Sequence, residues 1–425
     1  MKILVIMSLW TDKNAVGNTF SNWLGGEAWN NDLFSNLCWR AQQPDNRVCT
    51  DYYRVTDLEL LKKCLTPENI GEHFQYHGVP KQETGTQNNE KKLIAWLHRY
   101  SFHWIYATME MLQRNVRWTN HRFAEYLTEF MPDIVFTTAG SIGIIPRLIQ
   151  CIRRDTNAKI VYYLSDDIYG KYQTYPFYRR RPLMRHFRWA LQHADKLYGA
   201  SELLCEEYGK KFGVEITPLY KGCAFSPMRE KHPDVVKLVY AGNLFYGRQE
   251  TLGLLAEAIR DLNRVTPRAM LEIYTGTPVS EELRKKLEIP GACRIMGQRP
   301  YEQIREILNR ADIVLHVESF QQEQIDYVHY SFSTKIIDCL QSGSVTMAIG
   351  PAGIASVEYV RAIPGAVVID DLGKIPDMLG ELLENKTRFP EMAEQTREFA
   401  AKNHDIHRVR ESLRADFAEL LKADG

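Results

Sequence analysis

Short apolar runs alternate with segments of helical spacing along most of this chain, and the alternation begins again after about residue 225. Each run is bounded by turn residues or charges, which is typical of a strand buried on both faces. The runs are Lys2–Met7, Asp133–Thr137, Lys159–Leu164, Lys196–Gly199, Lys237–Ala241, Ala269–Tyr274, Ile313–Val317, Val345–Ile349 and Ala366–Ile369. Strands that alternate with helices predict parallel α/β sheets covered on both sides.

The restart predicts two Rossmann-like, doubly wound domains that face a cleft. The boundaries expected are 1–225 for the first domain and 226–400 for the second, with 401–425 a C-terminal helix that packs back on the first. Residues 65–130 are interpreted as an insertion or helical region, and 17–26 as a polar loop. The helices expected are Glu27–Ala41, Leu93–Leu112, Ser141–Arg154, Leu183–Ala194, Glu202–Phe212, Glu250–Arg264, Tyr301–Arg310 and Thr334–Ser342.

Composition excludes several classes of protein. The formal net charge of the 425 residues is zero, which argues against a general nucleic-acid binder. The eight cysteines include no Cys-x-x-Cys pair, so neither a zinc site nor a disulfide framework is expected, and a reducing cytoplasm is favoured. No apolar window is long enough to span a membrane, and the start does not read as a signal peptide. The histidines suggest no metal site.

The most informative segment is residues 331–351, which predicts a loop, a helix and a buried strand. Ser333 is a good N-cap residue, Thr334 begins the expected helix, and Lys335 lies in its first turn. Free backbone N–H groups, the helix dipole and a lysine together suit a phosphate group. The alternative is an ordinary capped helix with a solvated lysine. The first hypothesis is therefore a nucleotide-diphosphate site.

Three motifs resemble the two-domain glycosyltransferases of the GT-B fold, in particular the large retaining group numbered family 4 and its capsule and O-antigen transferases. Residues 241–248, Ala-Gly-Asn-Leu-Phe-Tyr-Gly-Arg, resemble that group's Gly-Arg-Leu-(three residues)-Lys loop. Residues 332–338, Phe-Ser-Thr-Lys-Ile-Ile-Asp, and the strand after Gly343 are also similar. The resemblance implies that Gly242, Asn243, Arg248, Ser333, Thr334 and Lys335 bind the donor diphosphate and that Asp338 binds the ribose.

The sequence departs from that family at two positions. Asn243 stands where the family has arginine, and Tyr330 stands where it has the carboxylate near the donor sugar. Glu318, at the end of an apolar strand, is a candidate for the missing carboxylate. Retention and inversion of the anomeric centre therefore both stay open, with retention implied by the family.

The first domain offers candidate acceptor and catalytic residues. Asp166 and Asp167 follow a buried strand, at the edge where α/β folds bind ligands. They are interpreted either as helix-capping turn residues or as acids that act on the acceptor. The expected loop with Gly17, Asn18, Gly25 and Gly26 resembles the first loop of some polysaccharide-assembly transferases and is a candidate acceptor loop.

Residues 168–194 hold six basic residues interleaved with aromatic ones and no acid. Arg181, Arg185 and Arg188 share one helical face, whereas Leu183 and Phe187 share another. The segment is interpreted either as a solvated basic face or as a patch for anionic lipid or a lipid-diphosphate acceptor.

The resemblance implies a cytoplasmic, membrane-peripheral glycosyltransferase of surface polysaccharide assembly. It would move a sugar from a nucleotide-diphosphate sugar, a UDP-sugar above all, to a saccharide or lipid-linked acceptor, with no cofactor. The alternatives are a GT-B-like sugar-nucleotide epimerase and a non-catalytic sugar-nucleotide-binding protein. A dinucleotide oxidoreductase is disfavoured, because no Gly-x-Gly-x-x-Gly follows the first strand.

Overall fold

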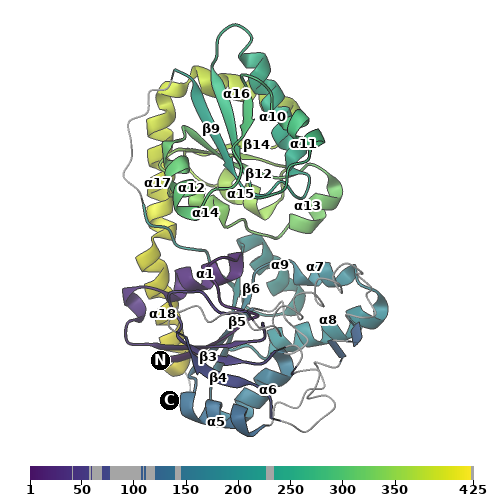
Figure 1. The fold of residues 1–425 in the computed structure, drawn as a ribbon, viewed down its shortest axis with the longest axis vertical. Coiled ribbons are helices and arrows are strands. Elements are labelled where there is room, and N and C mark those ends of the chain that lie inside the picture. Colours follow the sequence, from purple (N-terminus) through teal and green to yellow (C-terminus); the bar gives the residue numbers. More distant parts are fainter. Residues whose placement is uncertain are drawn as a thin grey trace. The chain divides into compact units, whose positions relative to one another are not determined.

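The structure is a computed structural model that describes residues 1–40, 42–56, 59, 69–76, 107–108, 110–111, 120–138, 145–225 and 234–422. Contacts divide the chain into two compact units (Figure 1). The N-terminal unit comprises Met1–Leu219 and Arg410–Gly425, and the C-terminal unit comprises Tyr220–Val409. The division falls at Leu219, whereas the sequence places it at 225. Much of the predicted insertion, with most of Leu93–Leu112, lies outside the described residues.

The N-terminal unit contains a sheet with the strand order β4-β3-β2-β1-β5-β6-β7-β8. All neighbouring strands are parallel except β4, which pairs antiparallel with β3 at one edge. The strands are β1 (Lys2–Ile6), β2 (Leu33–Cys38), β3 (Asp51–Arg54), β4 (Glu72–Gln75), β5 (Ile134–Thr138), β6 (Lys159–Leu164), β7 (Lys196–Gly199) and β8 (Thr217–Pro218). The strand order reverses between β1 and β5, which is the switch point of a doubly wound fold.

Helices connect these strands. They are α1 (Ala15–Leu24), η1 (Glu27–Trp29), α5 (His121–Phe130), α6 (Ile145–Asp155), α7 (Ile168–Gln173), α8 (Phe177–Gln192), α9 (Glu202–Phe212) and α18 (Ile406–Lys422). In α18 the ring of Phe417 contacts the rings of Trp29 and Phe136. The C-terminal helix is therefore part of the core of the N-terminal unit.

Two expectations about the first hundred residues are wrong. The predicted helix Glu27–Ala41 is instead the short η1 and strand β2, which pairs in parallel with β1. The predicted polar loop at 17–26 is mostly helix α1, which begins where the Asn14 side chain accepts a hydrogen bond from the Gly17 N–H. Phe20 and Trp23 of α1 are fully buried, so the helix packs firmly.

The C-terminal unit contains an all-parallel sheet with the order β11-β10-β9-β12-β13-β14. The strands are β9 (Val236–Ala241), β10 (Ala269–Tyr274), β11 (Cys293–Ile295), β12 (Ile313–Val317), β13 (Val345–Ile349) and β14 (Val367–Ile369). The helices are α10 (Arg248–Leu262), α11 (Glu281–Leu287), α12 (Tyr301–Arg310), α13 (Gln322–Val328), α14 (Lys335–Leu340), α15 (Ala355–Arg361), α16 (Ile375–Glu384) and α17 (Phe389–His404), with the short turns η2 (Leu372–Lys374) and η3 (Lys386–Arg388).

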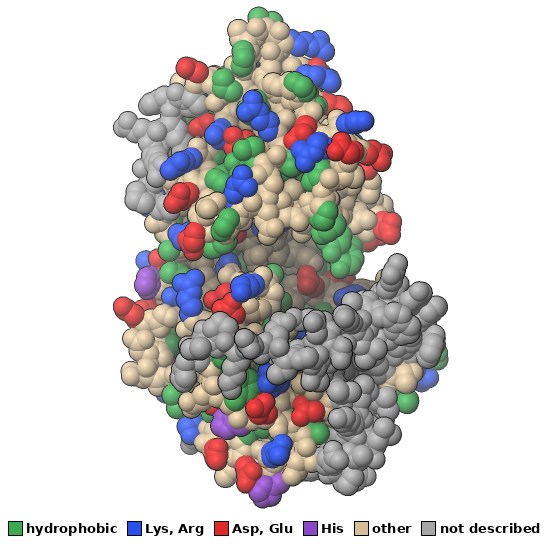
Figure 2. Space-filling view, viewed as in Figure 1, with side chains coloured by type: hydrophobic (Ala, Val, Ile, Leu, Met, Phe, Trp, Pro, Cys, Tyr) green, Lys and Arg blue, Asp and Glu red, His purple; other side chains and the backbone are tan. Residues whose placement is uncertain are grey.

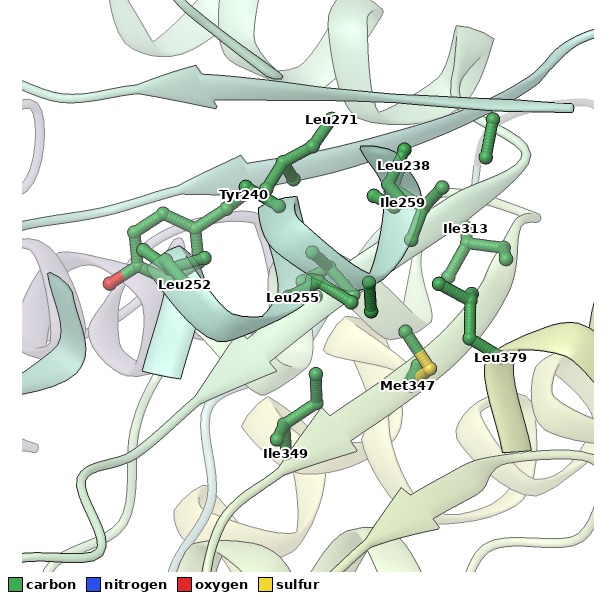
Figure 3. Close-up of a cluster of buried hydrophobic side chains, with 14 of the residues drawn as sticks. Leu238, Tyr240, Leu252, Leu255, Ile259, Leu271, Ile313, Met347, Ile349 and Leu379 are labelled. Atoms are coloured by element: carbon green, nitrogen blue, oxygen red, sulfur yellow. The ribbon is translucent and has the colours of Figure 1, made fainter. Parts of the chain in front are cut away.

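Alternate residues of the central strands enter cores on opposite faces of this sheet. Leu238 and Tyr240 join a cluster with Leu255 of α10, whereas Val239 packs with Leu308 of α12. Figure 3 shows Tyr240 at the edge of the first cluster, with its hydroxyl pointing away from the apolar side chains. The prediction of two parallel α/β domains covered by helices on both faces is confirmed.

Among the described residues, no helix combines the length and the apolar character needed to cross a membrane.

Candidate functional site in the C-terminal unit

The candidate donor residues gather at the switch point of the second sheet. Strands β9 and β12 are parallel neighbours from which the strand order runs outward in both directions. Gly242 and Asn243 directly follow β9, and Glu318 directly follows β12. Because parallel strands end at the same edge, these residues lie together where α/β sheets bind ligands.

Arg248, the first residue of α10, is held firmly at this edge. Its Nε and Nη2 donate to the two carboxylate oxygens of Glu318 at 3.0 Å each, and Nη1 donates to Asn243 Oδ1 at 2.8 Å. Nε also approaches the Val317 carbonyl oxygen at 3.1 Å. A guanidinium has five N–H donors, so two stay available for a ligand. Asn243 is thus a partner of Arg248 as well as a candidate ligand contact.

Glu318 is almost completely buried, with 2% of its surface exposed. Burial raises the pKa of its carboxyl group, and the positive charge of Arg248 opposes that effect. His316, two residues earlier on β12, is also buried, and burial together with Arg248 lowers its pKa to about 3. His316 is therefore neutral at physiological pH, and Glu318 supplies the countercharge of Arg248.

Lys335, the first residue of α14, places a second positive charge nearby. Its ammonium lies against the backbone of Gly242, where any Cβ would collide with it, and 5.8 Å from the centre of the Tyr240 ring. Within the described part of the chain it forms no ion pair. Burial, followed by the charge of Arg248, lowers its pKa to about 8. Burial and a neighbouring positive charge both disfavour the charged form of this lysine. A lysine in such surroundings is typical of a ligand site.

Lys335 and Asp338 line a cavity of about 290 Å³ with Gly242. Asp338 Oδ1 accepts a hydrogen bond from the Tyr301 hydroxyl at 2.9 Å, and burial raises the pKa of its carboxyl group. Part of the remaining lining comes from the end of β10 and from segments that follow β10 and β11: Tyr274, Thr275, Gly276, Gln298 and Arg299. Sequence reasoning missed this set. Thr275 and Gly276 directly follow β10, a predicted strand, and residues at that position often contact a ligand in α/β folds.

Ser333 and Thr334 precede Lys335 but are arranged differently from the expected cap. Thr334 occupies the N-cap position of α14 without a side-chain capping bond. The Ser333 N–H donates to Ser356 Oγ at 2.9 Å, so this donor is already used. Since α14 has only six residues, the lysine charge carries more of the anion attraction than the helix dipole does.

Asp166 and Asp167 lie in the N-terminal unit, just beyond β6. Asp167 caps α7 by accepting hydrogen bonds from the Gly170 N–H at 2.7 Å and from the Tyr208 hydroxyl at 2.5 Å. This contact matches the capping interpretation of Asp167. Asp166 is exposed at the same strand end and keeps its candidate role.

The candidate acceptor glycines are not in an extended loop. Gly17 and Asn18 lie in the first turn of α1, and a Cβ at Gly17 would collide with the Thr11 carbonyl. Gly25 and Gly26 follow the helix, and Gly26 has a φ of 85° with its Cα facing the Arg410 guanidinium. These glycines have structural reasons for their identity, and an acceptor role for them stays a prediction.

The described residues contain no group of three His, Cys, Asp or Glu side chains arranged to hold a metal ion.

No protein-family model matches this chain, and no curated protein sequence does. Solved structures do match its fold. Sucrose-phosphate synthase from Thermosynechococcus elongatus is 13% identical with a TM-score of 0.61, and 99% of each chain is covered. HepE of Anabaena, solved with UDP-glucose, is 11% identical with a TM-score of 0.61, and 100% of each chain is covered. WaaG, a glycosyltransferase involved in lipopolysaccharide biosynthesis, is 14% identical with a TM-score of 0.55 over 97% of this chain and 98% of WaaG.

At these identities the likeness establishes the architecture, which is the GT-B fold of two parallel-sheet α/β units.

Proposed function

We propose that this chain is a glycosyltransferase that moves a sugar from a UDP-sugar to a saccharide or lipid-linked acceptor in surface polysaccharide assembly. The observation that carries the proposal is the Lys335 ammonium, which lacks an ion-pair partner in the described chain and lies at the switch point beside Arg248. An ammonium with a lowered pKa gains most from an anionic ligand such as a diphosphate. The similarity in fold to HepE, solved with UDP-glucose, supports the donor class.

Different residues of the site are proposed to bind different parts of the donor. Lys335 and the two remaining N–H groups of Arg248 bind the diphosphate, and Asp338 accepts a hydrogen bond from a ribose hydroxyl. As the bond between the sugar and the diphosphate breaks, negative charge develops on the departing oxygen. Lys335 and Arg248 stabilise that charge, so they contribute to the transition state as well as to binding.

We assign Glu318 a positioning role rather than contact with the sugar. Both of its oxygens are bonded to Arg248, and its exposed fraction is 2%. Position 330 is a tyrosine, so the residue at that position offers no carboxylate to the donor sugar. The proposed reaction retains the anomeric configuration, with the leaving diphosphate accepting the acceptor proton. Asp166 is the protein group proposed to contact the acceptor.

The donor proposal is tested by thermal shift and calorimetry against UDP, GDP, ADP and TDP. UDP is expected to raise the unfolding temperature, because a ligand at 100 times its dissociation constant stabilises a protein by about 2.7 kcal/mol. Lys335→Ala should lose this response, while Lys237→Ala, at a surface lysine on β9, should keep it. An equal response to all four nucleotides, or to none, would refute the UDP assignment.

Product analysis then separates the enzyme classes. A glycosyltransferase hydrolyses its donor slowly without acceptor and transfers the sugar when a saccharide is added. An epimerase would instead convert UDP-glucose to a different UDP-sugar with no acceptor present. Tight UDP-sugar binding with neither outcome would favour a non-catalytic sugar-nucleotide-binding protein.

A further inference from the structure

A basic groove lies between α6 and α8 of the N-terminal unit, on residues that the donor site does not use. It encloses about 660 Å³. Its lining comes from both helices and consists of Pro146, Arg147, Gln150, Arg181, Pro182, Arg185, His186 and Trp189. Arg147 lies in α6, and α8 begins only at Phe177, so the tertiary structure brings Arg147 beside the α8 arginines.

Three arginines of this groove have no acidic partner among the residues that the structure describes. Arg179 pairs with Glu110, and Arg153 of α6 pairs with Asp195. In contrast, Arg147, Arg181 and Arg185 are exposed and form no ion pair with any residue that the structure describes. Exposed guanidinium groups gathered around one groove favour an anionic partner.

The absence of acidic residues from α8 differs from the mixed charges of the face drawn in Figure 2. On the face drawn in Figure 2, Lys and Arg side chains are interspersed with Asp and Glu side chains. That mixture agrees with a net charge of zero. Residues 168–194, which include α8, hold no acid at all. The positive charge of α8 is therefore a local feature.

Two large aromatic side chains project from the start of α8. Phe177 is 62% exposed and Tyr178 is 53% exposed, so two neighbouring rings present most of their surface to solvent. The Arg181 guanidinium lies 5.6 Å from the centre of the Phe177 ring, so the cations and the rings form one surface. The opposite side of α8 is fixed in the core, with Leu183 and Phe187 buried.

We propose that this surface docks on a membrane that contains anionic phospholipid. The arginines of the groove would bind lipid phosphates, since guanidinium groups contact phosphate oxygens in pairs. Phe177 and Tyr178 would enter the interfacial region, where amphipathic rings are favoured. The projecting rings favour a lipid surface over a nucleic acid or an anionic saccharide, neither of which offers them an apolar phase. The inference goes beyond the proposed transfer reaction and does not depend on it.

The test is co-sedimentation of the full chain with vesicles of phosphatidylcholine, with and without phosphatidylglycerol, at low and at physiological salt. Binding is expected only with phosphatidylglycerol and should weaken with salt. Each arginine near an anionic surface contributes about fivefold in affinity. The charge reversal Arg181→Glu/Arg185→Glu should therefore weaken binding about twentyfold or more.

Two further variants keep the result interpretable. Lys285→Glu/Lys286→Glu reverses the same charge on two exposed lysines of α11 and should leave vesicle binding unchanged. Phe177→Ala/Tyr178→Ala keeps every charge and should weaken binding severalfold. The UDP thermal shift, measured on all variants, reports folding and the donor site separately.

Three results would overturn the inference: no binding of the wild type to phosphatidylglycerol vesicles, an equal loss in the α11 control, or tighter binding to duplex DNA or to a soluble anionic polysaccharide than to vesicles.

Discussion

Replacing Lys335 with methionine should make the C-terminal unit more stable and at the same time abolish its response to UDP. The lysine ammonium is charged at neutral pH in a site that disfavours the charge, because it lies in a largely buried position near Arg248. Methionine has a similar length and no charge. It therefore removes the unfavourable charge while keeping most of the packing.

The magnitude follows from the pKa of Lys335, which falls from 10.5 to about 8. A shift of that size corresponds to about 3 kcal/mol against the charged form. Lys335 keeps some contact with solvent, which screens part of the effect, so the expected gain is about 1–2 kcal/mol at pH 7.

The pH dependence of this gain has a definite sign. Between about pH 8 and pH 10.5 the unfolded chain keeps the Lys335 proton and the folded chain releases it. Wild-type stability therefore rises with pH across this range relative to the methionine variant. The advantage of Lys335→Met should be complete at pH 7 and clearly smaller at pH 9.5.

Urea unfolding of the wild type and the variant at both pH values measures the effect. The transition that UDP shifts in the wild type identifies the unfolding of the C-terminal unit. Lys237→Met serves as the matched control, because Lys237 is a β9 lysine paired with Glu272 at the surface. A Lys335→Met protein that is less stable than wild type at pH 7, or that still responds to UDP, would refute the reasoning.

Other predictions concern the same side chains and their neighbours. UDP affinity should be constant below about pH 8 and fall up to tenfold per pH unit above it, because Lys335 then loses its proton. Calorimetry across pH 7–9.5 measures this affinity. Glu318→Gln should cost about 3 kcal/mol in urea unfolding, because it leaves the Arg248 charge buried without a countercharge, and Glu318→Gln/Arg248→Met should recover part of that loss. Asp167→Ala should lower the free energy of unfolding by about 1 kcal/mol through loss of the α7 cap. Asp166→Asn should lower the rate of sugar transfer and change the free energy of unfolding by less than about 0.5 kcal/mol. If Asp166→Asn instead lowered stability and Asp167→Ala lowered transfer, the two roles would be exchanged.

The strands that the sequence predicts best are those buried on both faces. β6, β7, β10, β12 and β13 have the predicted bounds, because such strands are continuous apolar runs. β2 was missed because it includes the polar Ser35 and Asn36, which are fully buried. Ser35 shares a hydrogen bond with the Tyr126 hydroxyl, and Asn36 donates to the Val5 carbonyl oxygen. These partners come from other elements, so the local pattern cannot reveal that the two side chains are satisfied.

The sequence by itself determined the alternation of strands and helices, and it selected Arg248, Lys335 and Asp338 as candidate donor residues, because local periodicity and position after a strand are visible in one dimension. Only the tertiary structure decided how each is used. The adjacency of β9 and β12 places Glu318 against Arg248, and that pairing leaves Lys335 as the cation of this site that has no carboxylate partner in the described chain. The physical reason is that burial and charge neutralisation depend on which strands are neighbours, and strand order is a property of the folded sheet.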